Sequence, residues 1–285
     1  MKAARIGTLV TAVVMVMMSW GAASAQTAPS AWTEPAIADN SFLIEEAFNQ
    51  EEGVVQHIST LTRSATSPRD YVYTLTQEWP FSTQTHQLSY SVPVAFLKST
   101  SANGIGDLMF NYRYQMPGLG PRLAISPRVS LLTASGNVEK GLGTGAWGTQ
   151  VNLPVSVRVT PAIAAHVNAG ATFVPNMRGT LDNGTTVKRS VNAYTFGGSI
   201  IAPVTMPVNA VLEYTVNNVG EIAGDGRIVR ETQHLLNPGV RFAINVGGTQ
   251  VVPGISVMID AAHPGAPKGV LGYFSVEHAF RNLKK

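Results

Sequence analysis

Gly104–Thr133 reads G-I-G-D-L-M-F-N-Y-R-Y-Q-M-P-G-L-G-P-R-L-A-I-S-P-R-V-S-L-L-T. From Leu108 to Met116, apolar or aromatic side chains occupy every second position and mostly polar ones lie between them. Successive side chains of a strand point to opposite faces, so this half predicts a strand with one aromatic face. Pro117–Pro121 reverses the chain, and the alternation resumes over Arg122–Leu132. The stretch therefore predicts a hairpin whose strands have about ten residues each, the length that crosses a bilayer when tilted.

Residues 1–25 have the pattern of an export signal. Lys2 and Arg5 precede an apolar run over Ile6–Trp20, and Ala23-Ser24-Ala25 forms a small-residue cleavage site. The alternative is a transmembrane anchor, but the run is short and no basic flank follows it. We therefore expect cleavage before Gln26. No later stretch approaches 18 uninterrupted apolar residues, so the sequence does not favour spanning helices.

The composition fits a membrane protein with little charge. The chain has 285 residues, of which 13% are charged, against about 25% in soluble domains. Without Lys2 and Arg5 there remain 20 − 2 = 18 basic and 17 acidic residues, a net charge of +1, which gives no indication of nucleic-acid binding. Cysteine is absent, so disulfides and thiol chemistry are excluded. No linker interrupts residues 53–285, which we expect to form one barrel.

Residues 26–52 precede the first expected strand. Residues 26–40 are rich in Ala, Pro, Thr and Ser and are typical of a lead-in without regular structure. Over Ser41–Gly53, a capping serine, early glutamates and a terminal glycine predict a short helix. Two interpretations remain open. The segment is either a short periplasmic helix or a plug that enters the pore.

From Gly53 onward the chain shows about twelve candidate strands, an even number as bacterial single-chain barrels require. We expect them at Val54–Thr62, Tyr71–Trp79, Gln87–Leu97, Asp107–Met116, Arg122–Leu132, Trp147–Val157, Ile163–Val174, Asn192–Ile201, Val208–Asn217, Gln233–Asn245, Thr249–Met258 and Val270–Phe280.

The connections between these strands alternate in length. Those after the even-numbered strands are short, as over Pro117–Pro121 and Val246–Gly248. Those after the odd-numbered strands are mostly longer: Ala134–Ala146, Pro175–Val191, Asn218–Thr232 and Ile259–Gly269. Short periplasmic turns and long outer loops are the layout of an outer-membrane barrel.

A soluble β-sandwich is the alternative fold, because it also alternates polar and apolar residues. Aromatic residues such as Trp79, Trp147 and Phe173 lie near strand ends, where interfacial girdles occur. The polar faces carry small residues and amides in place of many Lys and Glu, and edge protection is missing. We therefore predict an all-β, antiparallel up-and-down transmembrane β-barrel of about 12 strands, surrounded by outer-membrane lipid.

Ionisable residues on the predicted lumen faces are the candidate site residues. They are Glu78, Asp107, Arg113, Arg128, His166, Glu213, Arg241 and Glu277. Buried charges need partners, so a mixed ladder of arginines and acids is first of all structural. The functional alternative is a constriction that orients a polar solute. Both signs are present, so strong charge selectivity is not indicated.

Enzyme motifs are not found. The six histidines are scattered one per segment, without a nucleophile motif or metal-ligand spacing on a helix. Gly141–Gly145 lacks the lysine and the helix of a phosphate loop. We predict no catalytic site, metal or cofactor, and an outer-membrane hydrolase is only the third hypothesis.

A family resemblance rests on several short motifs. They are Phe42-Leu43-Ile44-Glu45-Glu46-Ala47 with Asn49-Gln50-Glu51 and Val54-Val55-Gln56-His57, then Gly104-Ile105-Gly106-Asp107-Leu108, Tyr112-Arg113-Tyr114 and Gly143-Thr144-Gly145 before Trp147. These motifs resemble the outer-membrane barrels grouped as the meta-pathway phenol-degradation family. The resemblance implies a barrel that passes small, often aromatic, substrates, and it carries over no functional residues.

The leading functional prediction is passive or facilitated passage of small solutes across the outer membrane. The alternative is a structural or surface-interaction barrel with a filled lumen. The sequence identifies neither the solute nor the oligomeric state.

Overall fold

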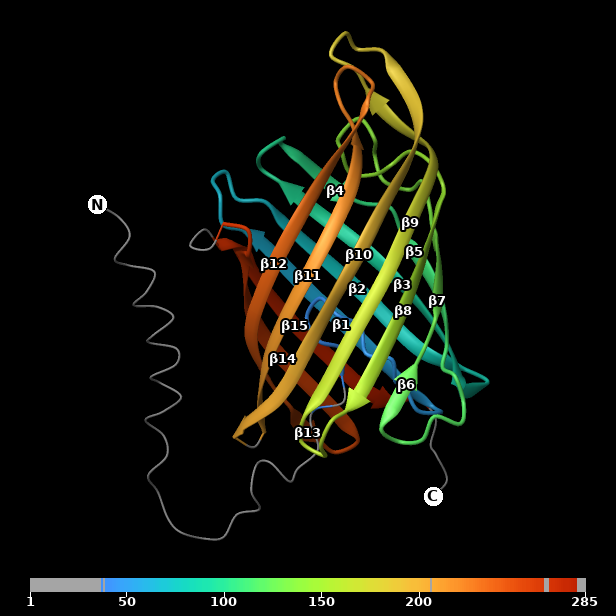
Figure 1. Cartoon of the computed structure of the whole chain (residues 1–285), viewed down its shortest axis with the longest axis vertical. Coiled ribbons are helices and arrows are strands. Elements are labelled where there is room, and N and C mark those ends of the chain that lie inside the picture. The colour runs from blue at the N-terminus through green and yellow to red at the C-terminus, as the bar shows by residue number, and fades with distance from the viewer. Residues whose placement is uncertain (1–36, 38, 206, 264–266, 281–285) are drawn as a thin grey trace, which may run out of the picture. The chain divides into compact units, whose positions relative to one another are not determined.

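A computed structural model describes residues 37, 39–205, 207–263 and 267–280, and these residues form an all-β fold without helices (Figure 1). No described helix is long and apolar enough to cross a membrane. The strands are β1 Val54–Ser64, β2 Tyr71–Phe81, β3 Thr83–Leu97, β4 Ala102–Ile105, β5 Met109–Tyr114, β6 Leu123–Ile125, β7 Arg128–Leu132, β8 Gly148–Arg158, β9 Ala164–Thr180, β10 Thr186–Thr205, β11 Val208–Ile222, β12 Ile228–Phe242, β13 Ile244–Val246, β14 Thr249–Asp260 and β15 Pro267–Ala279.

The strands close into a ring. Each ring strand pairs antiparallel with its neighbours, β1 pairs with β15, and β12 pairs with β14. The three short strands β4, β6 and β13 continue β5, β7 and β12, because each pair shares one partner strand. Fifteen strands minus these three leaves twelve ring positions. The predicted twelve-stranded antiparallel barrel is confirmed.

Two of the predicted strands are interrupted, Arg122–Leu132 and, at Ala243, Gln233–Asn245, and a third, Asp107–Met116, starts late. The strand expected at Arg122–Leu132 breaks between β6 and β7 at Ser126-Pro127, because proline has no N–H to donate to the ladder. The strand expected at Asp107–Met116 begins at Met109, and the preceding residues of that ring position form β4. Asp107 lies in the break, outside the pairing.

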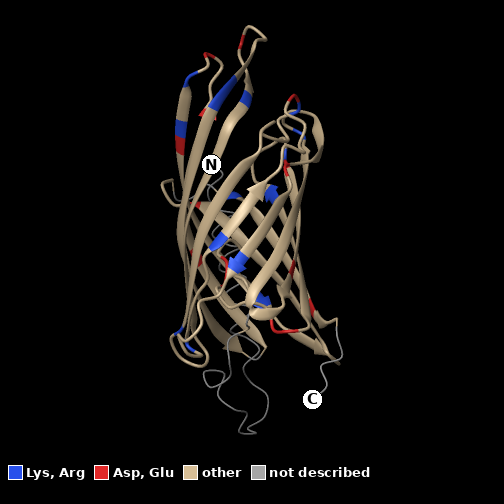
Figure 2. Ribbon diagram, turned by 90° about the vertical axis from the view of Figure 1, so that its right-hand side faces the viewer, with Lys and Arg blue, Asp and Glu red and all other residues tan. Residues whose placement is uncertain are grey.

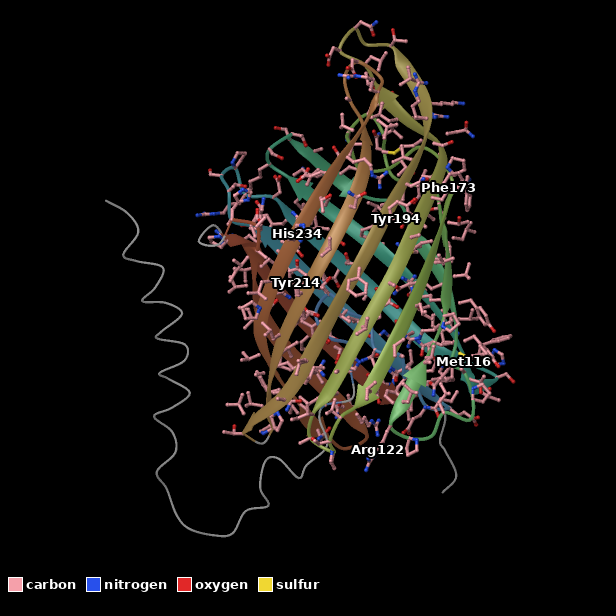
Figure 3. The ribbon with its side chains drawn as sticks, in the orientation of Figure 1. Met116, Arg122, Phe173, Tyr194, Tyr214 and His234 are labelled. Carbon is pink, nitrogen blue, oxygen red and sulfur yellow. The ribbon has the colours of Figure 1, made fainter. Side chains whose placement is uncertain are left out.

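The two faces of the wall follow the predicted alternation. In β5 and β7 the outward Phe110 and Val129 are 50% and 55% exposed, whereas the inward Arg113 and Arg128 are buried. Figure 2 shows that many Lys, Arg, Asp and Glu lie toward the ends of the barrel, and that only a few lie on the strands between. In Figure 3, Phe173, Tyr194, Tyr214 and His234 lie on the outer wall of β9 to β12. A large apolar outer band with aromatic residues is what lipid contact requires.

The two ends of the barrel differ. At the tight-turn end, short reversals follow β2, β5, β8, β10 and β13. At the opposite, long-hairpin end, two connections expected as loops are paired strands. β9 and β10 pair as far as Thr180 and Thr186, and β11 and β12 as far as Ile222 and Ile228. Gly184 and Gly226, at positive φ, allow the tight turns that close these hairpins, which stand above the other strands in Figure 1.

The helix expected over Ser41–Gly53 is not formed. The chain there makes bends and turns, with one short backbone bond from Ser41 N–H to the Ile44 carbonyl. The capping pattern was a local signal, and hydrogen bonds to the barrel wall replace the intrahelical ones. The predicted signal, residues 1–25, lies outside the described residues.

Candidate functional site

Residues 39–52, which we call the luminal segment, lie inside the barrel. Their hydrogen bonds and ion pairs reach ten of the twelve ring positions, namely β1, β3, β5, β7, β8, β9, β10, β11, β12 and β15. The segment starts among β12, β15 and β1, passes β10 and β11 to reach β9 and β7, and returns past β8, β5 and β3 to β1. Buried backbone groups need partners, and here the inward side chains of the wall supply them.

The start of the segment is held by one arginine and one aspartate. Arg241, fully buried, donates to the backbone carbonyls of Ile37 (2.7 Å), Asp39 (3.2 Å) and Asn40. The Asp39 carboxylate accepts hydrogen bonds of 2.6 Å from Gln56 Nε2 and from the hydroxyls of Tyr273 and Ser275. Three donors compensate for the burial of this carboxylate.

Residues 42–44 of the segment are held by a carboxylate of the wall and by an aromatic contact. Glu213 Oε1 accepts the backbone N–H groups of Leu43 (2.8 Å) and Ile44 (3.1 Å), and Glu213 Oε2 accepts Asn237 Nδ2 (2.6 Å). The Phe42 ring lies edge-on to Tyr273, with centroids 5.8 Å apart. It also lies against Gly239 and Gly254, where a Cβ would collide with it. Glycine at these wall positions leaves the space that the ring occupies.

A bidentate ion pair joins the segment to β7. Arg128 Nε lies 3.0 Å from Glu45 Oε2, and Arg128 Nη2 lies 2.7 Å from Glu45 Oε1. This fork geometry is the strong form of an arginine–carboxylate pair. Arg128 also donates to Asn111 and Gln150, each at 2.8 Å. We call the Glu45–Arg128 pair the latch.

The returning part of the segment binds β8, β5 and β3. Ala47 N–H donates to Ser156 Oγ (2.7 Å), whose hydroxyl also lies 2.6 Å from His166 Nδ1. Arg113 donates to Asn49 Oδ1 (2.8 Å) and to the carbonyl of Glu46 (2.8 Å).

Four charged side chains form one cluster around the latch. Arg113 Nη2 lies 3.7 Å from Glu78 Oε2, and Arg113 Nη1 lies 4.0 Å from Glu45 Oε2. With Arg128 the cluster contains two positive and two negative groups, so its formal charge is zero. The side chains of Arg113, Arg128 and Glu78 are at most 10% exposed, whereas that of Glu45 is 30% exposed. Neutrality is what allows buried charges to be tolerated at this site.

A cavity of about 150 Å³ adjoins the latch. Part of its lining comes from residues 40–45, and the rest comes from inward side chains of β1, β2, β3, β5, β7 and β15. Thr60 and Ser91 lie farther toward the long-hairpin end than Gln56 and Gln87, which contact the segment. The cavity therefore lies on the long-hairpin side of the luminal segment.

The structure brings most of the predicted site residues together. Glu78, Arg113, Arg128, His166, Glu213 and Arg241 all lie inside the barrel, beside the luminal segment or its direct partners. Asp107 does not join them. It binds the connection between β7 and β8, accepting the N–H groups of Gly136 (2.8 Å) and Thr144 (2.7 Å). Glu277 is half-buried, and within the described residues it makes no hydrogen bond to the segment.

Sequence reasoning missed the partners that the luminal segment itself contributes. Asp39, Glu45 and Asn49 each make side-chain contacts with the wall. A signal was present, since residues 39–52 are dense in carboxylates and amides. Locally the same residues also fit helix capping, and the partners that would distinguish a plug from a short helix lie far away in the sequence.

A comparison with protein-family models assigns the chain to a family. The model described as "Putative MetA-pathway of phenol degradation" matches residues 35–270. The chain belongs to this family. The match begins just before the luminal segment of this phenol-degradation family member and ends within β15. The family resemblance predicted from the sequence is confirmed.

Solved structures of outer-membrane proteins share this family member's fold. An outer-membrane channel from Pseudomonas putida F1 superposes with a TM-score of 0.58 at 12% identity, covering 81% of this chain and 97% of that chain. The NanC porin superposes with a TM-score of 0.51 at 9% identity, covering 80% of this chain and 99% of that chain. At these identities the likeness shows the barrel fold alone. A comparison with curated protein sequences gave no match.

Proposed function

We propose that this protein lies in the outer membrane and passes small solutes through its lumen, which the luminal segment closes at rest. The observation that carries the proposal is the way in which residues 39–52 occupy the lumen. They are held there by hydrogen bonds, ion pairs and contacts of the Phe42 and Phe48 rings, without a β-ladder and without a covalent link other than the chain's own continuation into β1. A segment held in this way can leave the lumen while the twelve-stranded ring stays intact.

The barrel itself is compatible with a path. Side chains alone fill an eight-stranded barrel, and a ring of twelve encloses more space. Many inward residues are small and polar, including Ser89, Ser91, Thr215 and Ser256, so the wall leaves room and can be wetted. The related fold occurs in proteins described as an outer-membrane channel and a porin.

A hydrolase is less well supported by the geometry. Ser156 and His166 form the one serine–histidine hydrogen bond in the described lumen, but Ser156 Oγ also accepts the Ala47 N–H and is fully buried. A nucleophile needs an exposed oxygen, and a histidine base needs a carboxylate that orients it. His166 Nε2 has no such partner among the described residues.

The same contacts also suit a structural barrel with a permanently filled lumen, and one reversible crosslink separates the two functions. Ser41 Oγ and Ser199 Oγ are 2.7 Å apart, and the chain has no cysteine, so Ser41→Cys with Ser199→Cys would form a single disulfide. In liposomes we expect the reduced double variant and Ser41→Cys alone to pass small neutral solutes, and the oxidised double variant to pass much less.

Deleting residues 39–52 should raise the flux above that of the unchanged chain, with the barrel still folded. Equal flux from the oxidised and the reduced double variant would refute the channel and leave the filled barrel, because deletion of the segment would open either one.

A further inference from the structure

We propose that the cavity beside the latch binds a small organic anion, a carboxylate on a compact apolar body, and that this anion competes with Glu45 for Arg128. The inference rests on the proposed function, in which the luminal segment is a removable closure. It adds the chemical class of the solute and the way in which the solute would release the segment.

The lining of the cavity combines apolar and polar side chains. The apolar ones are Phe42, Leu43, Ile44, Ile58, Met109 and Tyr273. The polar and charged ones are Asn40, Ser41, Glu45, Thr60, Thr76, Glu78, Ser89, Ser91, Asn111 and Arg128. Ligand sites combine a mainly apolar wall with a few polar groups that fix orientation. At about 150 Å³ the cavity is well below the roughly 300–1,000 Å³ of sites for drug-sized ligands, so a molecule with a single ring fits its scale.

Arg128 is already arranged to hold a carboxylate. Its Nε and Nη2 atoms bind the Glu45 carboxylate, and hydrogen bonds to Asn111 and Gln150 of the wall fix the orientation of the guanidinium. Glu45 is the partner that faces the cavity, since its side chain is 30% exposed against 8% for Arg128. A carboxylate that arrives through the cavity therefore meets the exposed half of the latch. It can replace Glu45 with the same fork geometry.

The charge of the cluster makes this exchange a competition. Arg113 and Arg128 balance Glu45 and Glu78, so an added anion would leave the cluster with an excess negative charge. An unpaired charge is costly in a buried site, and the exchange avoids it when Glu45 leaves. Glu45 is fixed to the luminal segment, so its departure removes one attachment of that segment. A neutral molecule of the same shape would leave the latch closed.

The test uses the full exported chain in detergent, with Ser41→Cys as its single cysteine. Ser41 is buried in the luminal segment, so the rate of maleimide labelling reports how often the segment leaves the lumen. Sodium benzoate is the probe, and benzyl alcohol is its uncharged counterpart of nearly the same shape. We expect benzoate to raise the labelling rate at least tenfold with saturation, and benzyl alcohol at the same concentration to leave it within twofold.

Two substitutions assign the effect to the latch. Glu45→Gln should raise the labelling rate without any ligand and should tighten benzoate binding, measured by equilibrium dialysis, because Arg128 then has no competing carboxylate. Glu52→Gln, on the same segment but exposed, is the matched control and should change neither quantity. Arg128→Met should abolish benzoate binding, whereas the exposed Arg227→Met should retain it.

Equal responses to benzoate and benzyl alcohol would overturn the inference, as would unchanged benzoate binding in Glu45→Gln. Labelling and dialysis measure the site without any flux. Benzoate binding that releases the segment in a protein that passes no solute would therefore refute the channel and leave the anion site standing.

Discussion

Truncating Phe42 should release the luminal segment while leaving the barrel folded. Phe42 is buried, edge-on to Tyr273 and seated over Gly239 and Gly254, and it belongs to the segment and not to the wall. Phe→Ala in a packed site costs about 3–5 kcal/mol. Almost all of that loss falls on docking of the segment, because the ring strands keep their own pairing. At about 1.4 kcal/mol per tenfold, the undocked population should rise by roughly 100-fold to several thousand-fold.

The assay is maleimide labelling of Ser41→Cys, alone and combined with Phe42→Ala. Where opening and closing are fast, the labelling rate is proportional to the undocked population. Leu43→Ala is the matched control, since Leu43 is 37% exposed at the cavity and loses little packing. We expect less than about a tenfold change from Leu43→Ala. A Phe42→Ala rate within threefold of the parent, with the barrel folded, would refute the view that this ring anchors the segment.

Three further predictions test other contacts. Gly254→Ala would place a Cβ 2.7 Å from the Phe42 ring and should raise Ser41→Cys labelling, whereas Gly248→Ala, with open space around it, should not. Tyr112→Arg on the outer wall should destabilise the barrel by roughly 2–4 kcal/mol near the bilayer midplane, measured by urea unfolding in lipid. The inward Thr60→Arg, in the cavity that Glu78 also lines, should cost less, and the opposite order would mean that the faces are misassigned. Burial raises the pKa of Glu46 in the luminal segment to about 7, against the opposing effect of Arg241. The docked state therefore favours the protonated acid. The labelling rate, divided at each pH by that of a free thiol because maleimide reacts with the thiolate, should increase from pH 5 to pH 8, and Glu46→Gln should flatten that dependence.

The sequence predicted the ring well because strand alternation is a local pattern. Phe110 and Tyr112 face outward and Asn111 and Arg113 face inward, as period two requires. The hairpins beyond Val174 and Asn217 were missed because glycine, asparagine and charged residues there resemble loop composition. Pairing between neighbouring strands stabilised them as strands all the same.

The site was only half predictable, for a different reason. Period two indicated that Arg113, Arg128 and Arg241 point inward, but nothing local indicates what they bind. Glu45 lies 83 residues from Arg128, and Leu43 lies 170 residues from Glu213. The helix predicted at Ser41–Gly53 failed for the same reason, since its capping signals were outweighed by partners that only the closed ring brings near.

The spread of these partners around the ring also sets the order of assembly. Asp39 bonds to Ser275 of β15, and Arg241 of β12 holds residues at the start of the same segment. The segment takes its partners from ten ring positions, so its docking is complete only after β1 has closed against β15. A newly closed barrel therefore passes through a stage in which residues 39–52 do not yet fill the lumen. In the proposed function this stage is an open pore, so the rate at which the segment docks bears on envelope integrity as well as on transport.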